Sequence, residues 1–159
     1  ENPAVEGGNT SLQPVFGTIA RGFMPLHYDA THEDAVRAGV ELNNPLVAED
    51  PENLARGAII YANFCAVCHG DTGRGNGPVT TRGFPPPPSL NGENARKIRD
   101  GQIFHLLTYG QNNMPPYSSQ ITREDRWRVI LHVRSLQTQA RQQVASTPTP
   151  LQPGKGVNP

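Results

Sequence analysis

Two cysteines and the histidine that follows them have the types and spacing most directly suited to chemistry. Cys65, Cys68 and His69 form the pattern C-x-x-C-H, and the chain has no other cysteine. In c-type haem attachment each thiol adds to one vinyl group of the porphyrin, and the histidine supplies an axial nitrogen to iron. The pattern therefore predicts one covalent haem c, attached through Cys65 and Cys68, with His69 as an iron ligand.

Other uses of a cysteine pair fit the sequence less well. A thioredoxin-like dithiol expects a βαβ context, whereas a helical pattern and a glycine-rich loop surround this pair. A structural zinc site needs two further ligands at matching spacing, and no second cysteine pair or H-x-x-x-H follows. A short disulfide between the two thiols is the remaining alternative.

The second axial ligand decides what such a haem would do. A haem closed by a thioether mainly transfers electrons, whereas an open sixth position suits a haem enzyme or a gas-binding sensor. Met114 stands in QNNMPPY, where two prolines would keep its loop stiff. We predict Met114 as the ligand and expect Met24 to be a packing residue. The rival histidines are His27, His32, His105 and His132, of which we expect His105 to be structural and His132 to be exposed to solvent.

Four further residues are assigned to the cofactor's surroundings, namely Pro78, Arg82, Tyr117 and Trp127. The carbonyl of Pro78 is expected against the imidazole of His69, where a hydrogen bond would fix the ring. Two basic clusters, at 96–99 and at 123–128, are candidate partners for the haem propionates.

Composition and charge restrict the class of protein. Only 35% of the 159 residues are hydrophobic, with 16 Gly and 16 Pro, so an apolar macrocycle would give this loop-rich chain a core to fold around. Basic and acidic residues cancel at 14 each, which makes nucleic acid an unfavoured partner. Long-range steering is weak without charge asymmetry, so we expect a docked subunit more than a freely diffusing carrier.

Capping and periodicity predict an all-α chain. Thr31 begins a short helix that extends to about Leu42, and Asp50 with Pro51 begins the helix that leads into the haem motif. Gly57 stands on that helix where a second helix could cross closely. Further helices are predicted over 100–109, ended by Gly110, and from Thr122 onward, with Trp127 as an anchor.

The chain divides into three predicted segments. Residues 1–49 form an irregular arm, either disordered or wrapped around the domain or a partner subunit. Residues 50–140 form a monohaem domain, and residues 141–159 form an extended Pro-rich tail. No stretch is apolar enough to span a membrane, and we expect an exported precursor.

A helix into CAVCHG, a Pro-rich loop, a Met-Pro loop and a Trp-bearing last helix resemble a class I cytochrome c over roughly residues 50 to 140. The segments GTIARG, RGFPPPPSL, DGQIFHLLTYGQNNMPPYSSQI and EDRWRVILHVRSLQ resemble more particularly the monohaem cytochrome c subunit (ActE) of bacterial alternative complex III, a quinol:electron acceptor oxidoreductase. The resemblance implies three to four core helices around one haem, with Gly57 and Trp127 where the first and last core helices cross.

The resemblance also implies a function and a place. The chain would relay electrons from a multihaem cytochrome to a terminal oxidase or a soluble carrier, as a non-catalytic subunit beside membrane subunits. It would lie in the periplasm or on the outer face of the bacterial inner membrane, either as a peripheral subunit or with a lipid anchor upstream of Glu1 in the precursor. Alternatives are a free periplasmic shuttle, the cytochrome subunit of a dehydrogenase, and an open-site haem enzyme or gas sensor.

Overall fold

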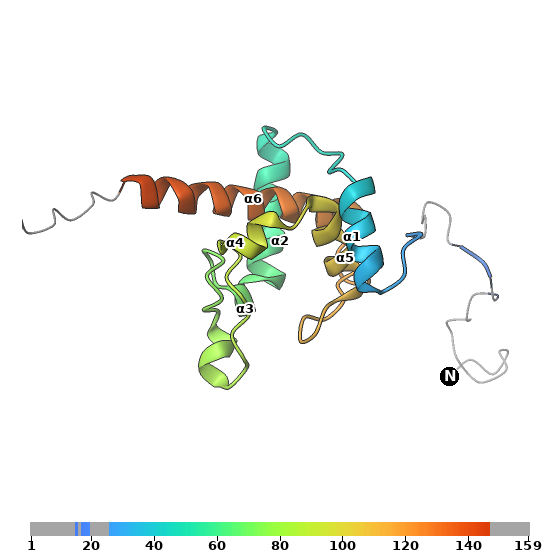
Figure 1. Ribbon diagram of the computed structural model, residues 1–159, viewed down its shortest axis with the longest axis horizontal. Coiled ribbons are helices and arrows are strands. Elements are labelled where there is room, and N and C mark those ends of the chain that lie inside the picture. Colours follow the sequence, from blue (N-terminus) through green and yellow to red (C-terminus); the bar gives the residue numbers. More distant parts are fainter. Residues whose placement is uncertain (1–14, 16, 20–25, 147–159) are drawn as a thin grey trace, which may run out of the picture.

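The fold is helical throughout the part of the chain that the structure describes (Figure 1). The computed structural model describes residues 15, 17–19 and 26–146. The elements are α1 His32–Glu41, α2 Pro51–Phe64, α3 Ala66–His69, the 3-10 helix η1 Pro78–Arg82, α4 Glu93–Lys97, α5 Asp100–Tyr109 and α6 Arg123–Ser146. The all-α prediction is confirmed, since an isolated bridge between Gln111 and Met114 is the only strand-like pairing among these residues.

The predicted helix starts are confirmed by their capping contacts. The Asp34 amide donates to the Thr31 hydroxyl at 3.1 Å at the start of α1. The Glu52 amide donates to the Asp50 carboxylate at 2.9 Å at the start of α2, and Pro51 occupies the first helical position. These caps place both helices within a residue of their predicted starts.

The later helices α5 and α6 also begin within a residue of their predicted starts, and α5 ends as predicted. The Asp125 amide donates to the Thr122 hydroxyl at 3.1 Å, so a side-chain cap satisfies one of the first free amides of α6. Helix α5 begins at Asp100 and ends at Gly110, which has a φ of 78°. A glycine adopts this positive φ without a Cβ clash and lets the chain turn into the Met114 loop.

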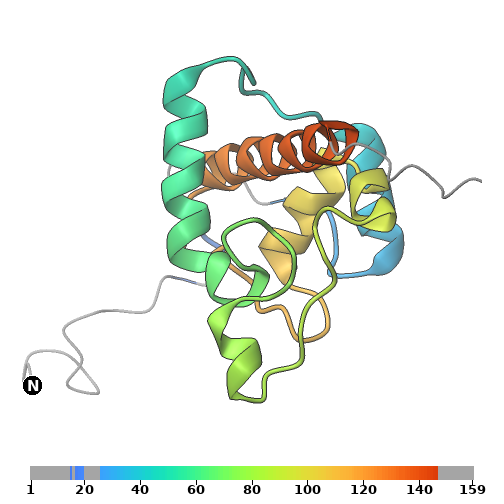
Figure 2. The same ribbon diagram turned by 90° about the vertical axis from the view of Figure 1, so that its left-hand side faces the viewer.

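Helices α2 and α6 cross steeply and in close contact at Gly57, as both ribbon views show (Figures 1 and 2). A Cβ at Gly57 would overlap the Arg128 carbonyl oxygen and lie 2.8 Å from its carbon. Only glycine therefore allows this separation, and the predicted crossing is confirmed. Trp127 lies beside that contact on α6, but its indole stacks on Phe104 of α5 at 4.2 Å between ring centroids.

An ionic network closes the same crossing. Arg56 of α2 donates from Nε and Nη2 to the two oxygens of Asp125 at 3.1 and 2.8 Å. Arg128 donates to Asp125 at 3.1 Å and to Asn53 at 3.1 Å. The Asp125 side chain is only 7% exposed, and its pKa is lowered, chiefly by the hydrogen bond from Arg56. The carboxylate thus remains charged while it links two helices.

The core lies between α2, α5 and α6. Its fully buried large side chains are Phe104, Val129 and Ile130. Partly buried residues that pack against it include Cys65, Leu90, Met114 and Tyr117. The core therefore extends to the segments that carry the predicted iron ligands.

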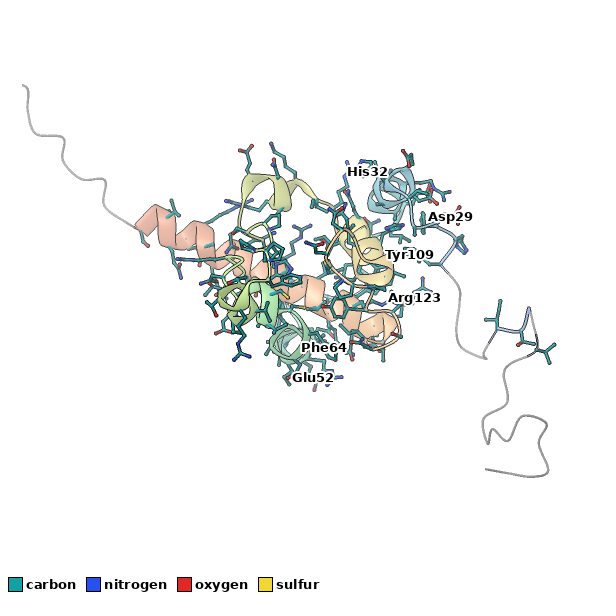
Figure 3. All side chains as sticks on the ribbon, turned by 90° about the horizontal axis from the view of Figure 1, so that it is seen from below. Asp29, His32, Glu52, Phe64, Tyr109 and Arg123 are labelled. Carbon is teal, nitrogen blue, oxygen red and sulfur yellow. The ribbon has the colours of Figure 1, made fainter. Side chains whose placement is uncertain are left out.

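The second half of the predicted arm belongs to the folded domain. Helix α1 packs against α5, where a Cβ on Gly101 would overlap the Ala38 carbonyl oxygen and lie 2.7 Å from that of Leu42. His105 bonds to the Asp29 carbonyl oxygen at 2.7 Å, and the Tyr109 hydroxyl donates to that of Tyr28. Figure 3 shows Asp29 and Tyr109 on these neighbouring segments. The arm thus wraps the domain from residue 26 onward.

The helical part of the chain extends further than predicted at the other end. Helix α6 continues through Ser146, so residues 141–146, which were predicted as extended tail, are helical. The run from Arg134 to Ser146 lacks proline and glycine, and nothing in it stops a helix. Met24 and residues 147–159 lie outside the described residues. None of the described helices is long and apolar enough to cross a membrane.

Substitution Gly57→Ala tests the helix crossing. In an open helix this change stabilises by up to about 1 kcal/mol, but here the added methyl group meets the backbone of α6. We expect the free energy of unfolding to fall by roughly 1–3 kcal/mol in urea titrations followed by circular dichroism. The control Ile59→Ala, at a side chain on the same helix that is 53% exposed, should change it by less than about 0.5 kcal/mol. A more stable Gly57→Ala protein would contradict the close crossing.

Acid titration of stability tests the ion pair. Because the pKa of Asp125 is lowered in the fold, its contribution is present above the ordinary carboxyl pKa and is lost as pH falls through the lowered value. Asp125→Asn should lower the free energy of unfolding by about 2 kcal/mol at pH 7, because Arg56 and Arg128 both lose their charged partner. The loss is no larger because Arg56 is half exposed and solvent screens its charge. The variant should also lose less stability than wild type between about pH 5 and pH 3. Equal acid sensitivity of both proteins would assign the titration to other groups.

Candidate functional site

The two cysteines lie where α2 ends and α3 begins. Cys65 is the residue between the two helices, and its amide donates to the Tyr61 carbonyl at 2.8 Å. The amides of Cys68 and His69 both donate to the Cys65 carbonyl, at 3.1 and 2.8 Å. This short helix fixes the thiols and the imidazole on one turn, the spacing that attachment to neighbouring pyrroles requires.

The state of the thiols argues against the alternative readings of the pair. Both are free, with no disulfide between them. Burial, followed by the nearby Cys68, raises the pKa of Cys65 to about 12. A redox dithiol needs a lowered thiol pKa, so this environment does not suit one. Among the described residues no group of three or more His, Cys, Asp or Glu side chains is placed to hold a metal ion.

His69 has the properties of an iron ligand whose second nitrogen lacks a partner. Burial lowers the pKa of its imidazole, which favours the neutral form that coordinates metals. Its Nδ1 is buried without a hydrogen-bond partner. The predicted bond from the His69 ring to the Pro78 carbonyl is not formed, and that carbonyl accepts the Thr81 hydroxyl at 2.8 Å inside η1. The free thiols and the neutral imidazole fit a c-type haem.

The glycine-rich segment after His69 packs directly on the motif. The Gly77 amide donates to the Cys68 carbonyl at 3.0 Å, and that of Gly75 to the His69 carbonyl at 2.8 Å. A Cβ at Gly77 would lie 2.6 Å from the Ala66 oxygen. Glycine is required for this close approach. The glycine-rich loop therefore supports the motif through backbone hydrogen bonds.

Tyr61 is a site residue that the sequence analysis missed. Its hydroxyl donates to the Gly70 carbonyl at 2.8 Å, and the whole side chain is 2% exposed. Burial raises its pKa, so the hydroxyl stays protonated and remains a donor. In the sequence Tyr61 stands only as one apolar position in the helical pattern, and nothing there signals a bond to a loop that follows nine residues later.

Met114 lies on a loop that is closed on itself. The amides of Gln111 and Met114 each donate to the other's carbonyl at 2.9 Å. Asn112, between them, has a φ of 52°, a left-handed conformation that asparagine tolerates better than most residues. Pro115 and Pro116 follow, as the predicted stiff loop requires.

Tyr117 joins the Met114 loop to the helix that carries the cysteines. Its ring meets that of Phe64 edge to face at 6.3 Å, and its hydroxyl lies 3.4 Å from the Phe64 carbonyl oxygen. Its amide donates to the Leu107 carbonyl at 2.9 Å. The predicted iron ligands thus belong to segments that one side chain holds together.

The other predicted contact residues differ in their surroundings. Arg82 is exposed at the end of η1, and Trp127 is buried against Phe104. Of the two basic clusters, Arg128 is paired with Glu124 and Asp125, and Arg126 is buried over the Phe104 ring at 4.6 Å. The cluster at 123–128 is therefore engaged in packing the helices, whereas Arg96 and Arg99 of the other cluster have no carboxylate partner among the described residues.

Of the rival histidines, His105 and His132 pack within the fold, whereas His27 and His32 are exposed. His105 is 3% exposed and bonds to the Asp29 carbonyl, as expected for a structural histidine. The expectation of solvent exposure was wrong for His132, which is half-buried with its ring 5.0 Å from that of Tyr61. The crossing at Gly57 draws this face of α6 onto α2, because the missing side chain leaves room for it.

The sequence also matches a known cytochrome family. Residues 52–133 match the family described as "Cytochrome C oxidase, cbb3-type, subunit III". The chain belongs to this cytochrome family. Its cofactor is accordingly a covalent haem c, with Cys65 and Cys68 as the attachment residues, and its helical architecture is that of class I cytochromes c.

Two curated relatives are subunits of respiratory complexes by name. The cbb3-type cytochrome c oxidase subunit CcoP of Rubrivivax gelatinosus is 34% identical over 105 residues, which are 63% of this chain and 31% of the relative. The cytochrome bc1 complex cytochrome c subunit of Corynebacterium diphtheriae is 30% identical over 87 residues, 54% of this chain and 28% of the relative. The matched part is thus about a third of each relative's length.

Substitution Tyr61→Phe tests the brace behind the motif. The change leaves the buried Gly70 carbonyl without its donor and should lower the free energy of unfolding by about 1–2 kcal/mol. It should also speed hydrogen exchange at the amides of Gly75 and Gly77. Tyr28→Phe is the matched control, because it removes a 2.8 Å bond to Glu41 far from the motif and should leave those two amides unchanged. Equal exchange in both variants would show that Tyr61 does not brace the loop.

Proposed function

We propose that this chain is a monohaem electron-transfer subunit of a respiratory complex, and more particularly the monohaem cytochrome subunit of an alternative complex III. In that role it takes one electron at a time from a multihaem cytochrome and passes it to a terminal oxidase or a soluble carrier. The observation that carries the proposal is the C-x-x-C-H turn joined, through Tyr117 and Phe64, to a loop that bears a methionine before two prolines.

Each group has a distinct part in this function. Haem iron supplies one-electron exchange, and a methionine sulfur favours the ferrous state relative to a second imidazole. His69 is the proximal ligand in the proposal, and its buried Nδ1 is free to take a partner that would orient the ring. Met114 is the distal ligand in the proposal. Two backbone hydrogen bonds between Gln111 and Met114 close its loop, which limits how far the sulfur can move away from the iron. Such a closed site suits an electron carrier better than an enzyme.

The choice of complex is supported by the chain's own segments. The stretches RGFPPPPSL and EDRWRVILHVRSLQ resemble the alternative complex III subunit, and both relatives are named as subunits of respiratory complexes. The proposed location is the periplasm or the outer face of the inner membrane, with membrane subunits as neighbours, and the chain is either peripheral or held by a lipid anchor upstream of Glu1.

Co-purification separates the complex from its alternatives. A tagged chain expressed in its own host should bring down a multihaem cytochrome at moderate salt from solubilised membranes. A chain that is found only as a monomer outside the membrane fraction would instead support the free shuttle. Recovery with a dehydrogenase would instead support the cytochrome subunit of a dehydrogenase.

Substitution Met114→Ala tests the axial ligand. The ferric wild-type protein should show the near-infrared methionine-to-iron charge-transfer band, and the variant should lose it. Its ferrous form should bind carbon monoxide rapidly, and its reduction potential should fall by roughly 0.1 V or more. Met24→Ala is the control and should keep the band. A band that survives in Met114→Ala would transfer the role to Met24 or a histidine, and rapid carbon monoxide binding by the wild type would favour an open-site haem protein.

A further inference from the structure

A segment outside the family match holds the helix that leads to Met114. Residues 27–41 precede the matched region, which begins at residue 52. His105 of α5 donates from Nε2 to the Asp29 carbonyl at 2.7 Å, and the Tyr109 hydroxyl donates to the Tyr28 carbonyl. Figure 3 shows Tyr109 beside the segment that carries Asp29. We call His105, Tyr109 and the two carbonyls that accept from them the arm clamp.

The accepting side of the arm clamp is fixed by α1. Tyr28 is 5% exposed, and its hydroxyl donates to the Glu41 carboxylate at 2.8 Å. The Asp29 amide donates to the Asp34 carboxylate at 2.5 Å. Helix α1 in turn packs on α5, where Gly101 allows close contact of the two backbones. The two carbonyls of the arm clamp therefore offer fixed acceptors to α5.

The donating side chains are committed to the same contact. His105 is 3% exposed and its Nδ1 is buried without a partner, so the bond to Asp29 is the one hydrogen bond that the described residues give this ring. Because a carbonyl can only accept, Nε2 carries the proton. The ring centroids of His105 and Tyr109 are 4.7 Å apart on one side of α5. Burial raises the pKa of Tyr109, so its hydroxyl remains a donor.

The base of the Met114 loop lies directly against the end of α5. Tyr109 is the last residue of α5, and Gly110 follows it. A Cβ at Gly110 would lie 2.6 Å from the Met114 carbonyl oxygen and 2.9 Å from the Pro116 nitrogen. The loop thus folds back onto the residue next to Tyr109. A displacement of Tyr109 would therefore shift the segment that carries Met114.

A hollow of about 580 Å³ lies between the start of α1 and the Met114 loop. Thr31 and His32 line it from the arm, and residues 111–116 line it from the loop. His105 and Tyr109 line it as well. The arm thus acts on the loop through the last turn of α5 rather than by direct packing across this hollow.

We propose that Tyr109 and His105 are positioning residues for Met114, through which the arm holds the methionine sulfur at the haem iron. This inference rests on the proposed role of Met114 as axial ligand and adds the residues that keep it in place. A methionine side chain has three rotatable bonds, so its own stiffness does little to fix the sulfur. The position of the loop then decides how often the sulfur leaves the iron.

The size of the effect follows from the strength of one hydrogen bond. The net contribution of a neutral hydrogen bond corresponds to about a 2- to 10-fold change in an equilibrium constant. If the arm clamp forms only when the loop is closed, the loss of one bond raises the open fraction by that factor. Coupling between two equilibria is reciprocal. Release of the methionine should therefore loosen the arm to the same extent.

Competition with imidazole tests the inference on the ferric holoprotein. Imidazole replaces Met114, and its apparent dissociation constant is inversely proportional to the fraction of molecules with an open loop. Tyr109→Phe should lower this constant about 2- to 10-fold and should speed carbon monoxide binding to the ferrous form by a similar factor. His105→Phe, which keeps a ring but loses the donor, should act in the same direction.

A control variant separates this effect from general destabilisation. Asp50→Ala removes the N-cap of α2, outside the arm clamp, and should change the imidazole constant by less than about 1.5-fold. An equal change in Asp50→Ala and Tyr109→Phe would overturn the inference. Imidazole binding of wild-type strength in both Tyr109→Phe and His105→Phe would also overturn it.

Hydrogen exchange tests the reciprocal effect on the arm. Saturation of the ferric wild type with imidazole should speed exchange at the Asp29 and Asp34 amides about 2- to 10-fold. The Glu52 amide, at the start of α2, should not respond. In Tyr109→Phe the two arm amides should already exchange faster and should respond less to imidazole. Exchange at Asp29 that imidazole leaves unchanged in the wild type would contradict the coupling.

The Met114→Ala variant distinguishes failure of the inference from failure of the proposed ligand. If that variant keeps the near-infrared band, the assignment of Met114 is wrong and the inference falls with it. If that variant loses the band while Tyr109→Phe and His105→Phe behave like the wild type, the ligand stands and only the inference falls.

Discussion

The close crossing of α2 and α6 at Gly57 is the constraint on which the other features depend. It lets the two backbones meet at Arg128, and the Arg56–Asp125 pair then holds the helices in that position. Because the haem-attachment turn follows directly from α2, the crossing also sets where Cys65, Cys68 and His69 lie relative to α6. Helix α5 packs on α6 through Phe104 and Trp127, and the Met114 loop continues from α5. A shift at Gly57 would therefore move both sides of the site.

Local chemistry made part of this arrangement predictable. The helix caps involve contacts between residues only a few positions apart, so the local sequence is enough to predict them. They are the N-caps at Thr31, Asp50 and Thr122 and the C-cap at Gly110. The haem motif is predictable for the same reason. Three features could not be predicted in this way, because they depend on segments that meet only in the folded chain. They are the missing bond between His69 and Pro78, the burial of His132 and the role of Tyr61.

The site holds its cofactor attachment rigidly. Hydrogen bonds from the backbone amides of Gly75 and Gly77 and from the Tyr61 hydroxyl hold the turn, which leaves little freedom for the ligand geometry to change with oxidation state. A small structural change on electron transfer keeps the reorganisation of the surroundings low.

The order of the helices along the chain has a consequence for assembly. Helix α1 precedes the cysteines, but α5, against which it packs, begins only at Asp100, and α6, the partner of α2, begins at Arg123. Both crossings therefore close loops that contain the attachment turn, and neither can form until the chain beyond that turn is available. During synthesis the thiols pass through a stage in which neither crossing has yet formed around them. The fold thus leaves the two thiols accessible for haem attachment first and buries them afterwards.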